Sequence, residues 1–147
     1  MDDFLDLINK LELPEKGYNL LEELRKKALI VRMAGKRDID NLISELSDRI
    51  APVVFTPQVY IELPILYFLR AHCHYVAMEL FKSETLGRTK KDIEKAADKF
   101  RIYNSEWNES LAHSYLGLLH CRGGDLDLCH KELATSTQIL MRLERDL

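Results

Sequence analysis

The chain has 147 residues, of which 46% are hydrophobic and 31% charged, and its formal net charge at pH 7 is -3. This length and balance are typical of one folded domain and exclude a disordered chain. The 21 basic and 24 acidic residues are intermixed, so the sequence lacks the basic excess that nucleic-acid binding usually requires. We therefore expect neither nucleic acid nor a membrane as the main partner.

Two further features bear on where the protein acts. The first residues, Met-Asp-Asp-Phe, are acidic where a signal peptide is basic, and the most apolar stretch, residues 59–81, is interrupted by charged residues and histidines that a membrane span would have to bury. The three cysteines, Cys73, Cys121 and Cys129, form an odd and sparse set, which is more typical of free thiols than of a disulfide framework. We expect a cytoplasmic protein.

Apolar residues at helical spacing predict three helices in the first 50 residues. The first begins near Phe4 and ends near Pro14, the second runs from Tyr18 to Met33, and the third is capped by Asp38 and extends to Ile50. Isolated helices of this length are marginal in water, so we expect them to pack side by side.

The stretch from Ala51 to Pro57 predicts an extended connector. Its β-branched residues are typical of a strand, but no partner strand is visible elsewhere, and one strand cannot form a sheet. Thr56 and Pro57 then predict the start of a helix that runs to about Lys82, because a hydroxyl cap followed by proline suits the first turn. Pro64 lies inside this pattern and should kink the helix or split off its first turn.

Three more helices are predicted in the second half. After a loop at residues 83–88, a helix begins at Thr89 and ends near Tyr103, and after a break at 104–108 the next runs from Glu109 to Cys121. A Gly-Gly turn follows, and Asp125 caps a last helix with leucines at four-three spacing. We expect one all-α domain of about seven helices over residues 1–147, with N-terminal helices at 1–50, a hairpin at 57–103 and a hairpin at 108–147 whose last helix is extended.

Residues 115–133 resemble a tetratricopeptide repeat. A Leu-Gly pair at 116–117 lies in the middle of one helix, a Gly-Asp turn follows at 124–125, and Cys129 and Leu133 occupy a small and a large position of the next helix. Ser136 occupies a later small position, and weaker copies lie at 69–100 and 28–46. The resemblance is specific over about residues 108–136. It implies antiparallel hairpins stacked as a short right-handed superhelix, with Gly117 where the two helices of a pair approach closely.

The resemblance also implies a function. Stacked hairpins of this kind present a concave wall, built mainly from the first helix of each pair, that binds a peptide or a partner's helix. We therefore expect a protein–protein interaction module, an adaptor or assembly subunit without catalytic residues, cofactor or metal. The inward-facing positions of the family correspond here to Phe68, His72, Tyr75, Ser114, Leu118 and Arg122. Burial statistics support equally well that Phe68, Tyr75 and Leu118 simply fill the core.

The predicted last helix offers a second candidate interface. Leu140, Leu143 and Leu147 lie beyond the part that its own hairpin can cover. They could pack back as a cap, pair with a second copy in a homodimer, or contact a partner protein. Trp107, in the predicted break before this hairpin, is either a packing anchor or an exposed contact.

Three cysteine–histidine neighbours support an alternative function, a small zinc- or thiol-dependent enzyme or sensor. They are Cys73-His74, His120-Cys121 and Cys129-His130. Zinc favours these ligands, but adjacent residues on a helix point about 100° apart, so each pair would supply one ligand. No Cys-x-x-Cys or His-x-x-x-His spacing is present. A helical domain that serves only for dimerisation is a third possibility.

Overall fold

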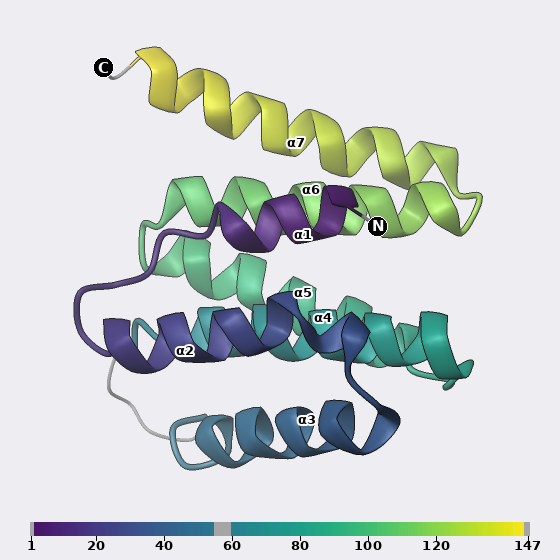
Figure 1. The fold of residues 1–147 in the computed structure, drawn as a ribbon. Coiled ribbons are helices and arrows are strands. Elements are labelled where there is room, and N and C mark those ends of the chain that lie inside the picture. The colour runs from purple at the N-terminus through teal and green to yellow at the C-terminus, as the bar shows by residue number, and fades with distance from the viewer. Residues whose placement is uncertain (1, 55–59, 146–147) are drawn as a thin grey trace.

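The structure, a computed structural model, describes residues 2–54 and 60–145. The regular secondary structure of these residues is entirely helical (Figure 1). The predicted all-α class is confirmed, with seven α-helices, one short 3-10 helix and no strand in the described residues. The elements are α1 (Asp2–Asn9), α2 (Tyr18–Leu29), η1 (Val31–Met33), α3 (Lys36–Ile50), α4 (Leu63–Phe81), α5 (Leu86–Ile102), α6 (Glu106–Arg122) and α7 (Leu126–Arg145).

Helices α3 to α7 form a stack in which each helix packs against the next one along the chain. Helix α2 contacts α4, and α1 contacts both α2 and α6 (Figure 1). Helix α7 lies at the end of the stack, and its main neighbour is α6. The first two helices therefore cover one face of the stack instead of extending it.

Helix α4 is the centre of the core. It packs against α2, α3 and α5, and its residues are buried from Leu63 to Leu69 and again from Ala71 to Ala77. A helix that is covered on several sides must be apolar around most of its circumference, which explains why the most apolar stretch of the sequence lies here. No helix in the described part of the chain combines the length and apolar character that a membrane span needs.

One ion pair joins three helices of the stack. Arg70 on α4 donates two hydrogen bonds to the carboxylate of Asp92 on α5, both at 2.8 Å. It donates a third to the hydroxyl of Ser47 on α3, at 3.1 Å. The hydrogen bond to Asp92 raises the pKa of Arg70. Because the pair is bidentate, it sets the relative orientation of α4 and α5 as well as their distance.

Three predicted helix boundaries in the first half are wrong. Helix α1 ends at Asn9 and not near Pro14. Helix α2 ends at Leu29, because the backbone of Ile30, with φ -102° and ψ 3°, interrupts it before the separate turn η1. Helix α3 begins at Lys36 after the extended Gly35, so Asp38 lies in the first turn, where its charge still suits the helix dipole.

Helix α4 begins at Leu63, and this places Pro64 in its first turn. Proline is tolerated there because the first turn has no internal acceptor for its missing N–H, so Pro64 lies in the first turn of α4 and not in its interior. The helix start predicted at residues 56–57 lies outside the described residues.

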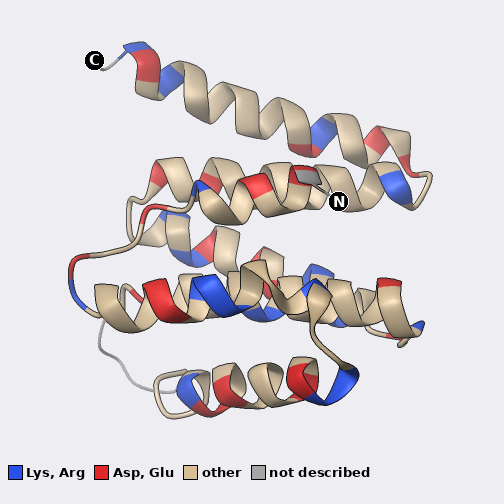
Figure 2. Ribbon diagram, viewed as in Figure 1, with Lys and Arg blue, Asp and Glu red and all other residues tan. Residues whose placement is uncertain are grey.

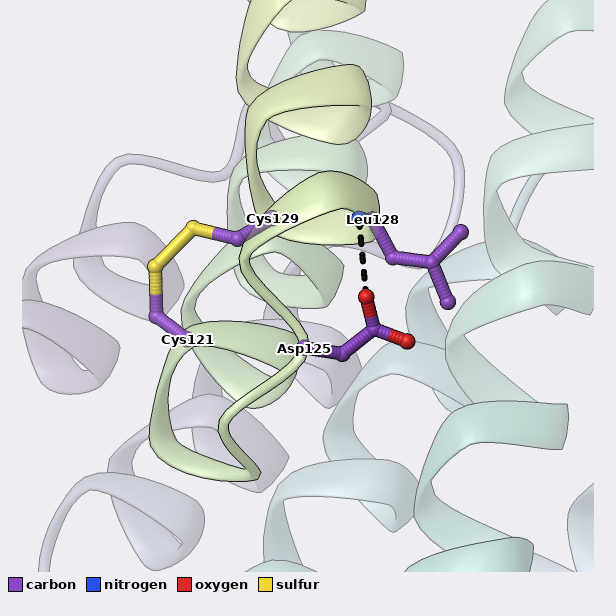
Figure 3. The surroundings of a disulfide bond; sticks show 4 residues. All are labelled: Cys121, Asp125, Leu128 and Cys129. Atoms are coloured by element: carbon purple, nitrogen blue, oxygen red, sulfur yellow. Dashed lines mark hydrogen bonds between the residues drawn. A yellow bond between two sulfur atoms is a disulfide. The ribbon is translucent and has the colours of Figure 1, made fainter.

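In the second half, α5 begins at Leu86, and the predicted start at Thr89 is wrong. Thr89 is buried inside the helix, where its hydroxyl donates to the carbonyl of Thr85 at 3.1 Å. Helix α6 begins at Glu106, so Trp107 lies in its first turn and not in a break. The predicted cap of α7 is confirmed, since the Asp125 carboxylate accepts a 3.1 Å hydrogen bond from the amide of Leu128 (Figure 3).

Candidate protein-binding site

The structure buries three of the six predicted groove residues. Phe68 and His72 are fully buried and Tyr75 is 2% exposed, so these side chains cannot contact a partner in this conformation. Phe68 packs against Phe100 of α5 and Tyr115 of α6, and His72 contacts Tyr115. Helix α1 covers Tyr75: the ring of Phe4 lies 4.5 Å from the ring of Tyr75 and 4.6 Å from that of Tyr115, measured between centroids. The sequence pattern predicted helix α1 but not that it packs against α4 and α6.

The other three predicted residues, all on α6, have different surroundings. The hydroxyl of Ser114 lies 2.8 Å from that of Ser136, so it joins α6 to α7. Leu118 is partly buried against the core. Arg122 is exposed over 46% of its side chain and is the most accessible of the predicted set. The six residues therefore do not form one open groove.

Helix α1 lies on the face formed by α2, α4 and α6 as a bound amphipathic helix would. Phe4 and Ile8 are fully buried and Leu11 is 3% exposed, whereas Asp3 and Asp6 are exposed. The four-residue spacing brings Phe4 and Ile8 to one side of the helix, and Leu11 follows just after the helix ends at Asn9. With eight residues, α1 is too short to be stable alone, so its helical form depends on the face beneath it.

Side chains at the start of α6 hold the main chain that follows α1. Asn108 accepts a hydrogen bond from the amide of Glu12 and donates one to the carbonyl of the same residue, both at 2.8 Å. The indole of Trp107 donates to the carbonyl of Lys10 at 2.9 Å. These hydrogen bonds involve only main-chain groups of Lys10 and Glu12, so they do not depend on which side chains the segment carries.

Arg25 on α2 holds the same segment from the other side. Its guanidinium donates to the carbonyl of Leu11 at 2.8 Å and to that of Asn9 at 3.4 Å. Glu22, one turn earlier on α2, pairs with Arg25 and orients it. The last carbonyls of a helix have no partner within the helix, and here side chains of the face supply partners for them.

A polar group closes the pocket that holds Phe4. The guanidinium carbon of Arg122 lies 5.0 Å from the centroid of the Phe4 ring. Arg122 also donates to the hydroxyl of Tyr75 at 2.9 Å and to the carboxylate of Glu79 at 2.8 Å. Glu79 receives a further hydrogen bond from Arg32 of η1 at 2.9 Å. Four segments of the chain thus meet around one aromatic ring.

Burial and hydrogen bonding change the pKa values within this group. Burial, together with the hydrogen bond to Glu79, raises the pKa of Tyr75, so its hydroxyl stays protonated and donates to Glu79 at 2.5 Å. Partial burial alone would raise the pKa of Glu79, but hydrogen bonds from Tyr75 and Arg32 outweigh it and the pKa is lowered. Glu79 is therefore the anionic centre on which both arginines converge.

A buried polar pair lies beneath the aromatic pocket. Nδ1 of His72 lies 2.8 Å from the hydroxyl of Tyr115, and both residues are fully buried. Burial lowers the pKa of His72 to about 3, so the imidazole is neutral at physiological pH. Burial also raises the pKa of Tyr115, so the pair is uncharged and its hydrogen bond fixes the register of α4 against α6.

The second predicted interface is partly open. Leu140 is 39% exposed and Leu143 is partly buried, whereas Leu147 lies outside the described residues. A hollow of about 590 Å³ lies beside this half of α7, with Glu109 of α6 on one side of it. Residues 133–141 of α7 carry no charge (Figure 2). Among the described residues, no helix covers this side of α7 as α7 covers α6.

The cysteines differ from the prediction of free thiols, which is wrong for two of them. Cys121 and Cys129 form a disulfide across the α6–α7 turn, with their Cα atoms 5.2 Å apart (Figure 3). Cys73 is free and buried, and burial raises the pKa of its thiol to about 12. Within residues 2–54 and 60–145, no cluster of three or more His, Cys, Asp or Glu side chains is placed to hold a metal ion.

Sequence reasoning missed the residues that hold α1. A lone Asn108 or Arg25 has no motif around it, so no local signal marks either as a main-chain clamp. Phe4 was recognisable as the first member of an apolar stripe, but the stripe does not say which face it contacts.

Comparisons with protein-family models, with curated proteins and with solved structures find no match to this chain. Its class is therefore defined by the fold alone. It is an all-α protein in which a stack of helices holds its own N-terminal helix on one face.

Proposed function

We propose that the chain is a protein–protein interaction module that binds an amphipathic helix of a partner on the face formed by α2, α4 and α6. We call this surface the helix-binding face, and its contact residues are Arg25, Tyr75, Trp107, Asn108, Tyr115 and Arg122. The observation that carries the proposal is the way in which α1 is held. Asn108 and Trp107 bind the main chain of the segment, not its side chains.

Main-chain recognition is what a surface needs if it is to accept segments of different sequence. Apolar pockets then provide selectivity, and here Phe4 and Ile8 fill such pockets completely. The composition of the face supports the same role, because tryptophan, tyrosine and arginine are the residues that most often dominate binding energy at interfaces.

The resemblance of residues 108–136 to a tetratricopeptide repeat supports this proposal. Under the resemblance, α4 and α6 are the first helices of two successive pairs and line the concave side of the stack, and α2 packs against α4 there. The close approach expected at Gly117 agrees with the packing, since a Cβ added there would lie 2.8 Å from Leu133 of α7. The adaptor role itself is an inference from architecture, and the binding experiment below tests it.

A ligand in trans has to compete with α1, because a segment tethered to its site has an effective concentration of the order of millimolar. The probe is therefore a fluorescent peptide of residues 2–13, tested on the full chain carrying Phe4→Ala, which weakens its own α1. We expect saturable binding by fluorescence anisotropy.

The control peptide carries Ile8→Asp, which places a charge in a fully buried position and should abolish binding. Circular dichroism of the Phe4→Ala chain establishes that it is folded. Equal binding of the two peptides to the folded chain, or binding of neither, would contradict the proposed face.

A further inference from the structure

We infer that the helix-binding face selects a segment with an aromatic anchor and an aliphatic anchor four positions later on a short helix, followed by a second aliphatic anchor just after the helix ends, and that α1 with the residues after it is the internal competitor of this ligand. The inference rests on the proposed function and adds the class of ligand and its regulation. The pattern is that of Phe4, Ile8 and Leu11, the three buried residues of the bound segment.

The pocket of Phe4 is built for a ring. Tyr75 and Tyr115 approach it with centroid distances of 4.5 and 4.6 Å and interplanar angles of 40° and 55°, within the range of favourable tilted aromatic pairs. The guanidinium of Arg122 lies over the same ring, 5.0 Å from its centroid. An aliphatic side chain would fill part of this space but would lose both the aromatic contacts and the cation–π contact.

Arg122 covers the pocket without being part of the core. Its side chain is 46% exposed, and its partner Glu79 is 21% exposed. Arg32, which also bonds to Glu79, is 39% exposed. These polar groups therefore lie at the solvent-exposed rim of the pocket, above the apolar residues that line it.

Release of α1 is a local event. The helix is near the N-terminus of the chain, has eight residues and precedes a non-helical segment that ends at Gly17, where φ is +77°. The stack from α3 to α7 is connected by its own helix–helix contacts and by the Arg70–Asp92 pair. Terminal elements with few neighbours open at a lower free-energy cost than the core does. The ligand and α1 then exclude each other, and the strength of α1 docking sets the apparent affinity.

The experiment compares two fluorescent peptides of residues 2–13, one with the natural phenylalanine and one with Phe4→Leu. Both are titrated into the full-length chain carrying Phe4→Ala and into the same chain with Arg122→Gln added. We expect the phenylalanine peptide to bind roughly tenfold more tightly than the leucine peptide. Arg122→Gln should reduce this preference to roughly threefold, because the cation–π contact is lost while the two tyrosines remain.

Arg49→Gln, a change at an exposed arginine on α3, is the matched control and should leave the preference unchanged. In the wild-type chain, excess phenylalanine peptide should raise amide hydrogen exchange in residues 3–9, which reports displacement of α1. Binding of both peptides with equal affinity overturns the aromatic selectivity and leaves the proposed function standing. Binding without faster exchange in residues 3–9 overturns the competition. If neither peptide binds, the proposed function itself fails.

Discussion

Asn108 and Glu12 lie 96 positions apart in the chain, and the side-chain amide of the first is paired with both main-chain groups of the second at 2.8 Å. Asn108 is 3% exposed, so its carboxamide is one of the few polar groups in the core, and both its polar atoms are used. The pair fastens the segment after α1 to the first turn of α6. It therefore couples the docking of the N-terminal helix to the rest of the fold.

Asn108→Ala should lower the free energy of unfolding by about 1–3 kcal/mol, because both polar groups of Glu12 lose their partner. Urea denaturation followed by circular dichroism measures the change. Asn41→Ala, at an exposed position of α3, is the control and should stay within about 0.5 kcal/mol of wild type. If Asn108→Ala also changes the free energy of unfolding by less than about 0.5 kcal/mol, the hydrogen bonds between Asn108 and Glu12 contribute little to stability.

Gly117→Ala tests a close approach between α6 and α7. A Cβ at this position would lie 2.8 Å from both Cγ and Cδ2 of Leu133 and 3.4 Å from the carbonyl of Cys129. Overpacking of this kind costs about 1–3 kcal/mol, which exceeds the gain of about 1 kcal/mol from alanine's better helix propensity. We expect a net loss of about 1 kcal/mol in thermal or urea unfolding.

Gly87→Ala is the matched control for Gly117→Ala. It also lies in a helix, but a Cβ there would meet nothing within 4 Å. We expect it to be neutral or to stabilise the protein by up to about 1 kcal/mol. If both substitutions change the free energy of unfolding equally, Leu133 moves to make room for the added Cβ without a cost in stability.

Reduction of the Cys121–Cys129 disulfide should lower the melting temperature. The bond closes a short loop, so the expected loss is about 2 kcal/mol, near the lower end of the usual range. Cys121→Ser gives the same comparison without reductant, and Cys121 is the exposed member of the pair. Wild type and Cys121→Ser should melt alike in the presence of reductant. If wild type melts alike with and without reductant, the bond does not stabilise the fold.

His72 should make the protein less stable in acid. Its pKa is lowered by burial from an ordinary value of 6.5 to about 3 in the folded state. Between these values the unfolded chain binds a proton that the folded chain excludes, so stability falls by roughly 1.4 kcal/mol per pH unit as the pH decreases below 6.5. His72→Gln keeps a hydrogen-bonding group for Tyr115 but cannot titrate.

The measurement for His72 is urea denaturation at pH 7 and pH 5. Wild type should lose about 2 kcal/mol more than His72→Gln between the two pH values. The comparison isolates His72, because the other groups that titrate in this range are common to both proteins. Parallel pH dependences would show that the His72 position is solvated or protonated in the folded state.

Most helices of this protein were predictable because each has a periodic apolar stripe. The stripe at Ile39, Leu42, Leu46 and Ile50 is an example, and all four residues are buried. The starts of helices were less predictable: Thr89 has the sequence of a cap but lies buried within α5, which begins at Leu86. Its hydroxyl donates to the carbonyl of Thr85 one turn earlier, so a hydroxyl residue that looks like a cap also suits a helix interior.

The candidate site was harder to predict from the sequence than the fold. The prediction located Phe68, His72 and Tyr75 on the correct helix, but packing against α1, α5 and α6 buries them. A stripe such as Phe4, Ile8 and Leu11 shows that a helix must bury one side and does not show against what. The clamp by Asn108 depends on two segments that meet only in the folded chain.

By itself, the amino-acid sequence determined the all-α class, the approximate position of the helices and the Asp125 cap of α7, because these depend on spacings within a few residues. Only the tertiary structure decided that α1 packs on the face formed by α2, α4 and α6 and that Cys121 is joined to Cys129. Contacts between distant segments depend on which apolar faces bury one another, and many pairings satisfy the same local pattern. Local sequence therefore predicts where the helices lie along the chain, and tertiary packing decides which helices contact one another.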